Sequence, residues 1–246
     1  MQVELWPSPG AGEESVESLF GGGKEAGGKE GLPGPGFPSP VKIREFMASS
    51  GSPGEYAAFV RGVFKDRAGL SPADGIWDLL DYLEQETDFY SAPASTRYHG
   101  AEPCGLVRHS LLVFANGIEL APLLLKGKVD SYCLSAACLF HDLCKTNMYE
   151  SRLRNVKDEK TGEWKKEPFY AVRQDYISYG HGIESLLRLS RFIDLSEAWR
   201  HAVRWHMGAY DISQLDKIAM EKAMAAYREV LFLQTADMLA GAVEGV

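Results

Sequence analysis

The residues best suited to chemistry are His and Asp side chains that interrupt apolar stretches. Residues 139–146 read LFHDLCKT, so an apolar run that includes Leu134 and Phe140 ends in the pair His141 and Asp142. An imidazole beside a carboxylate in such a place is either a hydrogen-bonded pair within the core or part of a metal site. The remaining His and Asp residues distinguish between these two interpretations.

Three other predicted helices also place a His or an Asp among the apolar residues of one face. These are His109, His206 and Asp237, on helices expected over residues 105–125, 196–207 and 217–241. His109, for example, shares its face with Leu106 and Val113, three residues before it and four residues after it. A buried carboxylate is costly unless it is paired or binds a metal. The four helices together therefore predict a shared cation, and their imidazole and carboxylate groups suit Mn, Fe, Zn, Co or Ni better than Ca.

Helix periodicity does not place two further histidines, His201 and His181, on an apolar helix face. His201 lies five residues before His206, about 140° around the helix, so we expect it on a surface or packing face. His181 stands between two glycines ahead of an amphipathic helix expected over residues 182–193. Glycines permit close approach of the backbone to a ligand, but periodicity alone leaves the role of His181 open.

The elements expected to position these groups are mostly α-helical. Ile76, Leu79 and Leu80 recur at helix spacing behind a helix start at Ser71-Pro72. The remaining helices are expected over residues 105–125, 129–144, 182–193, 196–207 and 217–241. Residues 149–172 lack a helical period and contain Thr161-Gly162 between two segments, which predicts a β-hairpin or a structured loop. The predicted fold class is thus all-α, a helical bundle with a small β-hairpin insertion.

Length and composition are those of a globular protein with a polar N-terminal segment. The 246 residues are 45% hydrophobic and 24% charged. Residues 1–40 are rich in Gly, Pro and Ser and hold six glutamates against two lysines, a net charge of −4. They predict a disordered tail, followed by one folded domain over residues 41–246. The overall net charge of −8 argues against an extended nucleic-acid surface.

The sequence also bears on membranes and on the redox environment. No apolar run approaches the ~20 residues of a membrane helix, and the first residues lack the features of a signal peptide. We therefore expect a cytoplasmic protein without membrane association. The cysteines form no CxxC pair, and we interpret them as small apolar residues in a reducing compartment. They are Cys104, Cys133, Cys138 and Cys144.

Five short motifs occur in a fixed order along the chain. They are STRYHGAEPCGLVRHSLLV, FHDLCK, YGHGIES, RWHMG and TADMLAG. In this order they resemble the motifs of the HD superfamily of metal-dependent phosphohydrolases in its six-ligand, two-metal form, including the superfamily's Gly-Gly-Leu-x-x-His and HDxGK boxes. The likeness is closest to uncharacterised bacterial and phage HD-domain hydrolases. The chain departs from the pattern at Pro103-Cys104-Gly105, where a Gly-Gly pair is usual, and at Cys144, which replaces the glycine of HDxGK.

The resemblance implies an HD-domain helical bundle with two divalent metal ions, Mg being a further candidate for their identity. One metal would be held by His109, His141, Asp142 and Asp237. Asp142 would bridge to a second metal, which His181 and His206 would also bind. A metal-activated water would attack a phosphorus centre. Lys145 would contact the substrate phosphate or the developing charge, although a lysine at a helix C-terminus is also favoured by the macrodipole.

The resemblance also suggests a substrate class and further binding residues. Arg154 and Lys157 of the expected hairpin are candidates for a phosphate clamp, although interspersed acidic residues favour a solvated hairpin. His99 is a candidate pocket residue. The leading function is hydrolysis of a phosphate ester of a nucleotide or short oligonucleotide. The alternatives are an HD-fold di-iron oxygenase, which shares the six-ligand order, and a non-catalytic metal- or nucleotide-binding module. The oligomeric state stays open.

Overall fold

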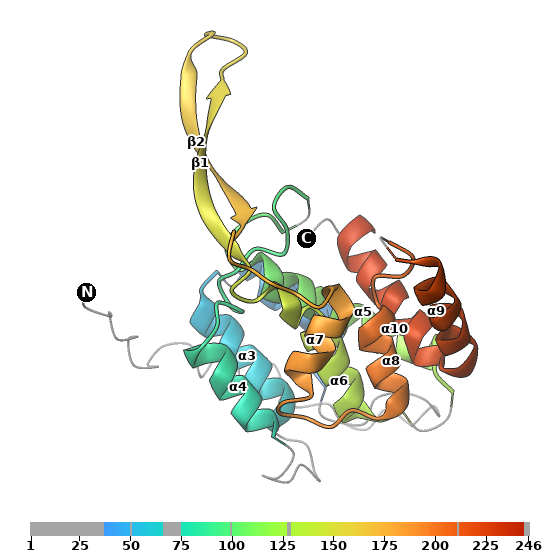
Figure 1. Ribbon diagram of the computed structural model, residues 1–246. Helices are drawn as coiled ribbons and strands as arrows, with labels where there is room; N and C mark the ends of the chain where they lie inside the picture. Colours follow the sequence, from blue (N-terminus) through green and yellow to red (C-terminus); the bar gives the residue numbers. More distant parts are fainter. Residues whose placement is uncertain are drawn as a thin grey trace.

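The structure, a computed structural model, is described over residues 37–49, 51–65, 75–98, 100–126, 129–210 and 212–243. Within these ranges the chain forms a bundle of helices from which one two-stranded antiparallel hairpin projects (Figure 1). The predicted all-α bundle with a small hairpin insertion after the His-Asp pair is therefore confirmed. No helix within the described ranges has the length and apolar character needed to cross a membrane.

The helices occur in two groups, one before the hairpin and one after it. The first half of the chain forms α2 (Pro40–Ser49), α3 (Pro53–Lys65), α4 (Ile76–Gln85), α5 (Gly105–Leu124), α6 (Ser131–Phe140) and the short 3-10 helix η2 (Leu143–Lys145). After the hairpin come α7 (His181–Leu189), α8 (Glu197–Trp205), α9 (Gln214–Ala226), α10 (Arg228–Met238) and a π-helical turn, η3 (Leu239–Val243).

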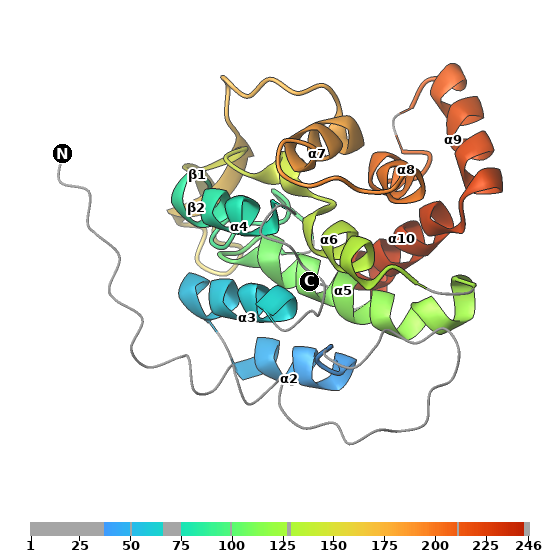
Figure 2. The same ribbon diagram turned by 90° about the horizontal axis from the view of Figure 1, so that it is seen from below.

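The helices differ greatly in how deeply they lie in the bundle. Figure 2 shows α5 between α2 and α6, with α10 packed against it. Because α5 is covered on several sides, most of its residues are buried.

Local sequence signals account for several helix ends. The Asp130 side chain accepts hydrogen bonds from the backbone N–H groups of Tyr132 and Cys133 and so caps the start of α6. At the start of α5, a Cβ atom on Gly105 would lie 2.0 Å from the carbonyl oxygen of Gly100, so only glycine fits. Cys104 has a φ of 62°, in the left-handed region that favours glycine. The residue that replaces the first glycine of the usual pair thus keeps a backbone conformation suited to glycine.

The hairpin consists of β1 (Tyr149–Lys157) and β2 (Trp164–Val172), in the register Tyr149↔Val172 to Lys157↔Trp164. Its existence and place agree with the prediction for residues 149–172. Figure 1 shows it extending away from the helices, with its Tyr149 end attached to the body.

Some predicted boundaries are wrong. The single helix predicted over residues 217–241 is two helices, because Tyr227 is extended with φ −129° and ψ 114°. Its ring stacks on His201 with 5.2 Å between the ring centroids, and α9 and α10 run in different directions (Figure 2). The helix predicted to end at residue 144 ends at Phe140. The helix start at Ser71-Pro72 lies outside the described residues.

The described residues begin at Phe37, four residues before the predicted start of the folded domain at residue 41. Residues 1–36 of the predicted tail lie outside the described residues. Phe37 packs against Phe114 of α5 with 5.6 Å between the ring centroids, and α2 begins at Pro40. The apolar side chain of Phe37 therefore belongs to the folded domain.

Candidate metal centre

Six His and Asp side chains from five parts of the chain converge in one cluster. They are His109 of α5, His141 and Asp142 after α6, His181 at the start of α7, His206 at the end of α8, and Asp237 of α10. All six were predicted as metal ligands. The structure brings all of them together.

Asp142 lies between two sets of imidazole rings. Its Oδ1 is 2.6 Å from Nε2 of His181 and 3.3 Å from Nε2 of His206. Its Oδ2 is 3.5 Å from Nε2 of His141 and 3.7 Å from Nε2 of His109. The two oxygens of one carboxylate therefore face two different pairs of histidines.

Asp237 completes the group on the α5 side. Its Oδ1 lies 3.0 Å from Nε2 of His109 and 3.7 Å from Nε2 of His141, and the two Nε2 atoms are 3.3 Å apart. Potential ligand atoms of these three residues lie within 4.8 Å of one another, as do those of His141, Asp142 and His206. Each group has the size of a metal coordination site.

The backbone orients two of the rings. Nδ1 of His141 lies 3.0 Å from the carbonyl oxygen of Cys138, and Nδ1 of His206 lies 2.7 Å from that of Val203. In each pair Nδ1–H donates to the carbonyl, which leaves the lone pair of Nε2 directed at the cluster. Nε2 of His206 is buried and has no hydrogen-bond partner among the described residues, although Asp142 lies beside it. A nitrogen lone pair that faces a carboxylate fits a cation between the two groups, so the residues suit a metal.

The charges within the cluster stabilise one another. Burial alone would raise the pKa of Asp142, but Lys145, His141 and His181 outweigh it and hold this pKa well below its ordinary value. Burial would lower the pKa of His181, but the charge of Asp142 and its hydrogen bond raise it to about 9. The pKa of Asp237 is likewise lowered, because His109 and His141 outweigh its burial. Both carboxylates are thus anionic ligand candidates at neutral pH.

Lys145 adjoins the cluster without belonging to the candidate ligand set. Its Nζ lies 2.7 Å from Oδ2 of Asp142. Burial would lower its pKa, but the charge of Asp142 outweighs burial and raises it. Tyr149, at the attached end of β1, also interacts electrostatically with Lys145, and burial raises the pKa of its phenol to about 12. The sequence reasoning did not identify Tyr149.

Of the other predicted substrate residues, Arg154 and Lys157 do not join the cluster. Lys157 lies eight residues beyond Tyr149, about 27 Å along an extended strand, and Arg154 lies five residues beyond it, about 17 Å. Since the hairpin extends away from the helices (Figure 1), both side chains are remote from the His and Asp residues. Arg154 instead lies over the ring of Phe169, 5.7 Å from its centroid. His99 lies outside the described residues.

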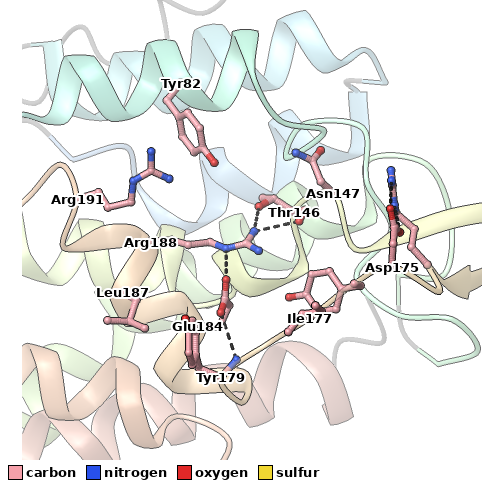
Figure 3. A pocket seen from close by; sticks show the side chains of 12 residues that line it. Tyr82, Thr146, Asn147, Asp175, Ile177, Tyr179, Glu184, Leu187, Arg188 and Arg191 are labelled. Atoms are coloured by element: carbon pink, nitrogen blue, oxygen red, sulfur yellow. Dashed lines mark hydrogen bonds and ion pairs between the residues drawn. The ribbon is translucent and has the colours of Figure 1, made fainter.

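A set of residues that the sequence reasoning missed supports the loop after Asp142. Arg188 of α7 donates through Nη1 to the carbonyl oxygens of Leu143 at 2.9 Å and Thr146 at 3.0 Å, and also to the Thr146 hydroxyl. Its Nε donates to Glu184 at 2.8 Å. Figure 3 shows the guanidinium between Glu184 and Thr146. A signal existed in the sequence, because Arg188 lies seven residues after His181 and thus on the same helix face.

Arg188 also lines a surface groove of about 680 Å³, together with Tyr82, Asn147 and Tyr176 (Figure 3). None of the six candidate ligands lies among the described residues that line this groove. The groove thus shares no lining residue with the six candidate ligands, and Thr146 and Asn147 of the loop after Asp142 line it.

Gly182 lets α7 and α8 approach closely enough to bring His181 and His206 together. A Cβ atom at position 182 would lie 2.1 Å from the carbonyl oxygen of Arg204 and 3.0 Å from that of Val203. Gly182→Ala should therefore destabilise the protein by about 2 kcal/mol, measured by urea unfolding, because the backbone of α8 must move.

Gly51→Ala is the matched control for this prediction, because a Cβ atom at position 51 would have no neighbour within 4 Å. Its free energy of unfolding should stay close to that of the wild type. Equal stability of the two variants would contradict the close packing of α7 on α8.

Comparison with known proteins yields one match. A family model described as HD domain matches residues 106–242, more than half of the chain. The matched segment runs from the start of α5 to the end of the helical region and contains all six clustered residues. No curated protein and no solved structure gives a significant match.

Proposed function

The chain belongs to the HD domain family, whose members are mostly metal-dependent hydrolases, and from this premise we propose that it hydrolyses phosphate esters of nucleotides or short oligonucleotides. One observation carries the proposal. The two oxygens of Asp142 face His181 and His206 on one side and His109 and His141 on the other. A carboxylate in this position suits a pair of cations that share it as a ligand.

The side chains present would hold two divalent ions. His109, His141 and Asp237 would hold one, and His181 and His206 the other, with Asp142 shared between them. When bound, such ions lower the pKa of a water molecule and neutralise charge on phosphate oxygens. The backbone carbonyls of Cys138 and Val203 hold the rings of His141 and His206 with Nε2 directed at the cluster. The net charge of −8 favours a small substrate over an extended nucleic acid.

Lys145 would bind the substrate phosphate. Its ammonium group lies 2.7 Å from Asp142 and therefore beside the position where the reacting phosphate would lie. Lys145→Met should lower kcat about 100-fold at unchanged metal content, because a donor to the developing charge is lost. Turnover measured at saturating substrate, together with elemental analysis of each preparation, tests this.

Lys157→Met provides the matched control, since Lys157 lies on the hairpin near its tip. Its turnover should equal that of the wild type. A comparable loss in both lysine variants would mean that the hairpin reaches the substrate, and unchanged turnover in Lys145→Met would remove Lys145 from the mechanism.

The function itself is tested by elemental analysis followed by a substrate panel. The purified protein is loaded with Mn, Co, Zn or Mg and assayed on phosphomonoesters, phosphodiesters and nucleotides, with phosphate or nucleotide release as the readout. Two metal ions per chain and metal-dependent release would support the proposal. Oxygen consumption with ferrous iron and no phosphoester turnover would replace it with the oxygenase alternative. Bound metal without either activity would indicate that the protein is a non-catalytic binding module.

A further inference from the structure

Cys144 occupies the position of the glycine in the HDxGK box and places a thiol in the metal centre. The residue lies in η2 and is buried. Its Sγ lies within 4.8 Å of potential ligand atoms of both Asp142 and His181. Sulfur, carboxylate oxygen and imidazole nitrogen are the three donor types found in protein zinc sites. A glycine at this position could not supply the first of them.

The backbone of Cys144 is held from both sides. Its N–H donates to Oγ of Ser185 at 3.0 Å, and its carbonyl oxygen accepts a hydrogen bond from the Tyr176 hydroxyl. Because Ser185 lies on the same helix as His181, the thiol and the imidazole belong to one rigid arrangement. The backbone position from which the Cys144 thiol projects is therefore determined by the fold.

A second observation indicates an incomplete ligand set at this side of the cluster. Nε2 of His206 is buried without a hydrogen-bond partner among the described residues, and it lies 3.3 Å from Oδ1 of Asp142. The same oxygen is 2.6 Å from His181. A cation at this side would thus have two nitrogen donors and one oxygen donor within reach, with the sulfur of Cys144 close by as a fourth.

We propose that Cys144 is a ligand of the cation held by Asp142, His181 and His206, and that it makes this position selective for thiophilic divalent ions such as Zn²⁺ or Co²⁺ over Mg²⁺. The inference rests on the proposed metal centre and extends it by a ligand. On binding, the sulfur–metal bond forms as the thiol proton leaves to solvent, and no group is oxidised or reduced. Thiolates prefer softer ions, whereas Mg²⁺ prefers oxygen ligands.

The other cysteines of the chain have no comparable position. Among the described residues, Cys144 is the only cysteine within a group of potential metal ligands. Cys133 and Cys138 are buried in α6. Cys133 lies eight residues before His141, about 12 Å along a helix, which makes it a suitable control.

Cobalt substitution tests the inference. The full-length protein is stripped of metal and titrated with Co²⁺, and its near-ultraviolet absorption is recorded. The wild type and Cys133→Ala should show a thiolate-to-cobalt charge-transfer band, and Cys144→Ser and Cys144→Gly should not. In a chelator competition, the Zn²⁺ affinity of Cys144→Gly should be about 10-fold or more below that of the wild type, while its Mg²⁺ affinity should be unchanged.

The possible outcomes distinguish the role of Cys144 from the proposed metal-dependent hydrolase. Stoichiometric Co²⁺ binding by the wild type without the band would overturn the role of Cys144 and leave the proposed hydrolase intact. The same conclusion would follow if the band persisted in Cys144→Ser. Failure of the wild type to bind any divalent ion would overturn both. If the Cys144 variants fold poorly, the presence or absence of the charge-transfer band in the wild type decides whether a thiolate binds the Co²⁺ ion.

Discussion

Asp142→Ala should lower metal-dependent turnover by about 10³-fold or more, the largest loss expected for any single residue. Of the six candidate ligands, Asp142 alone faces both pairs of histidines, with Oδ1 toward His181 and His206 and Oδ2 toward His109 and His141. Its removal would take a ligand from both cations at once. Turnover and metal content of the same preparation should therefore fall together.

The control for this variant lies on the helix of another candidate ligand. His201 is on α8 with His206, but it stacks on Tyr227 and lies 3.3 Å from Glu197. His201→Ala should keep both metal and turnover. Asp142→Asn, which retains the volume of the side chain, separates loss of charge from loss of packing, and circular dichroism verifies that each variant is folded. Unchanged turnover in a metal-loaded Asp142→Ala protein would contradict the proposed hydrolase mechanism.

The sequence predicted the ligands on apolar helix faces more directly than it predicted His181. His109 and Asp237 stand on apolar faces that the 3.6-residue period reveals without knowledge of any other helix. His181 is the first residue of α7, where periodicity carries little information. It reaches Asp142 because Gly182 allows α7 to pack closely on α8, and such a contact between helices has no local signature. For His181 the family resemblance supplied what the residue pattern could not.

Orientation and backbone breaks were the features that local patterns could not predict. The lack of a helical period and the Thr161-Gly162 turn predicted the hairpin, but they contain nothing about its direction relative to the helices. Arg154 and Lys157 are consequently remote from the cluster although they follow the His-Asp pair closely in sequence. The break at Tyr227 has no Gly or Pro to mark it, and it is stabilised by the contact of Tyr227 with His201. Neither feature has a local signature in the sequence.

The loop that carries Asp142 depends on α7 in two ways. His181, at the first position of α7, contacts the carboxylate itself at 2.6 Å. Ser185 and Arg188, one and two turns later, bind the backbone of the loop. One face of a single helix therefore supplies both a candidate ligand and the hydrogen bonds that position the neighbouring ligand. Any change that weakens these hydrogen bonds should affect stability and metal binding together.

Arg188→Met should destabilise the protein by about 3 kcal/mol and lower its metal affinity. The guanidinium donates to the carbonyl oxygens of Leu143 and Thr146 and pairs with Glu184, and its side chain is only 19% exposed. Methionine preserves much of the apolar stem but leaves two carbonyl oxygens and a largely buried carboxylate without this donor. Urea unfolding of the metal-free protein measures the stability, and a chelator competition measures the affinity.

Arg191→Met is the matched control, because Arg191 lies in the turn after α7, lines the same groove (Figure 3) and contacts the ring of Tyr82, 5.3 Å from its centroid. A cation–π contact of this kind contributes about 1 kcal/mol, so its loss should cost far less than the loss of Arg188. The metal affinity of Arg191→Met should equal that of the wild type, since Arg191 is not bonded to the loop that carries Asp142 by any hydrogen bond among the described residues. If Arg188→Met lost stability but bound metal as tightly as the wild type, the hydrogen bonds to Leu143 and Thr146 would support the fold alone and would not position Asp142.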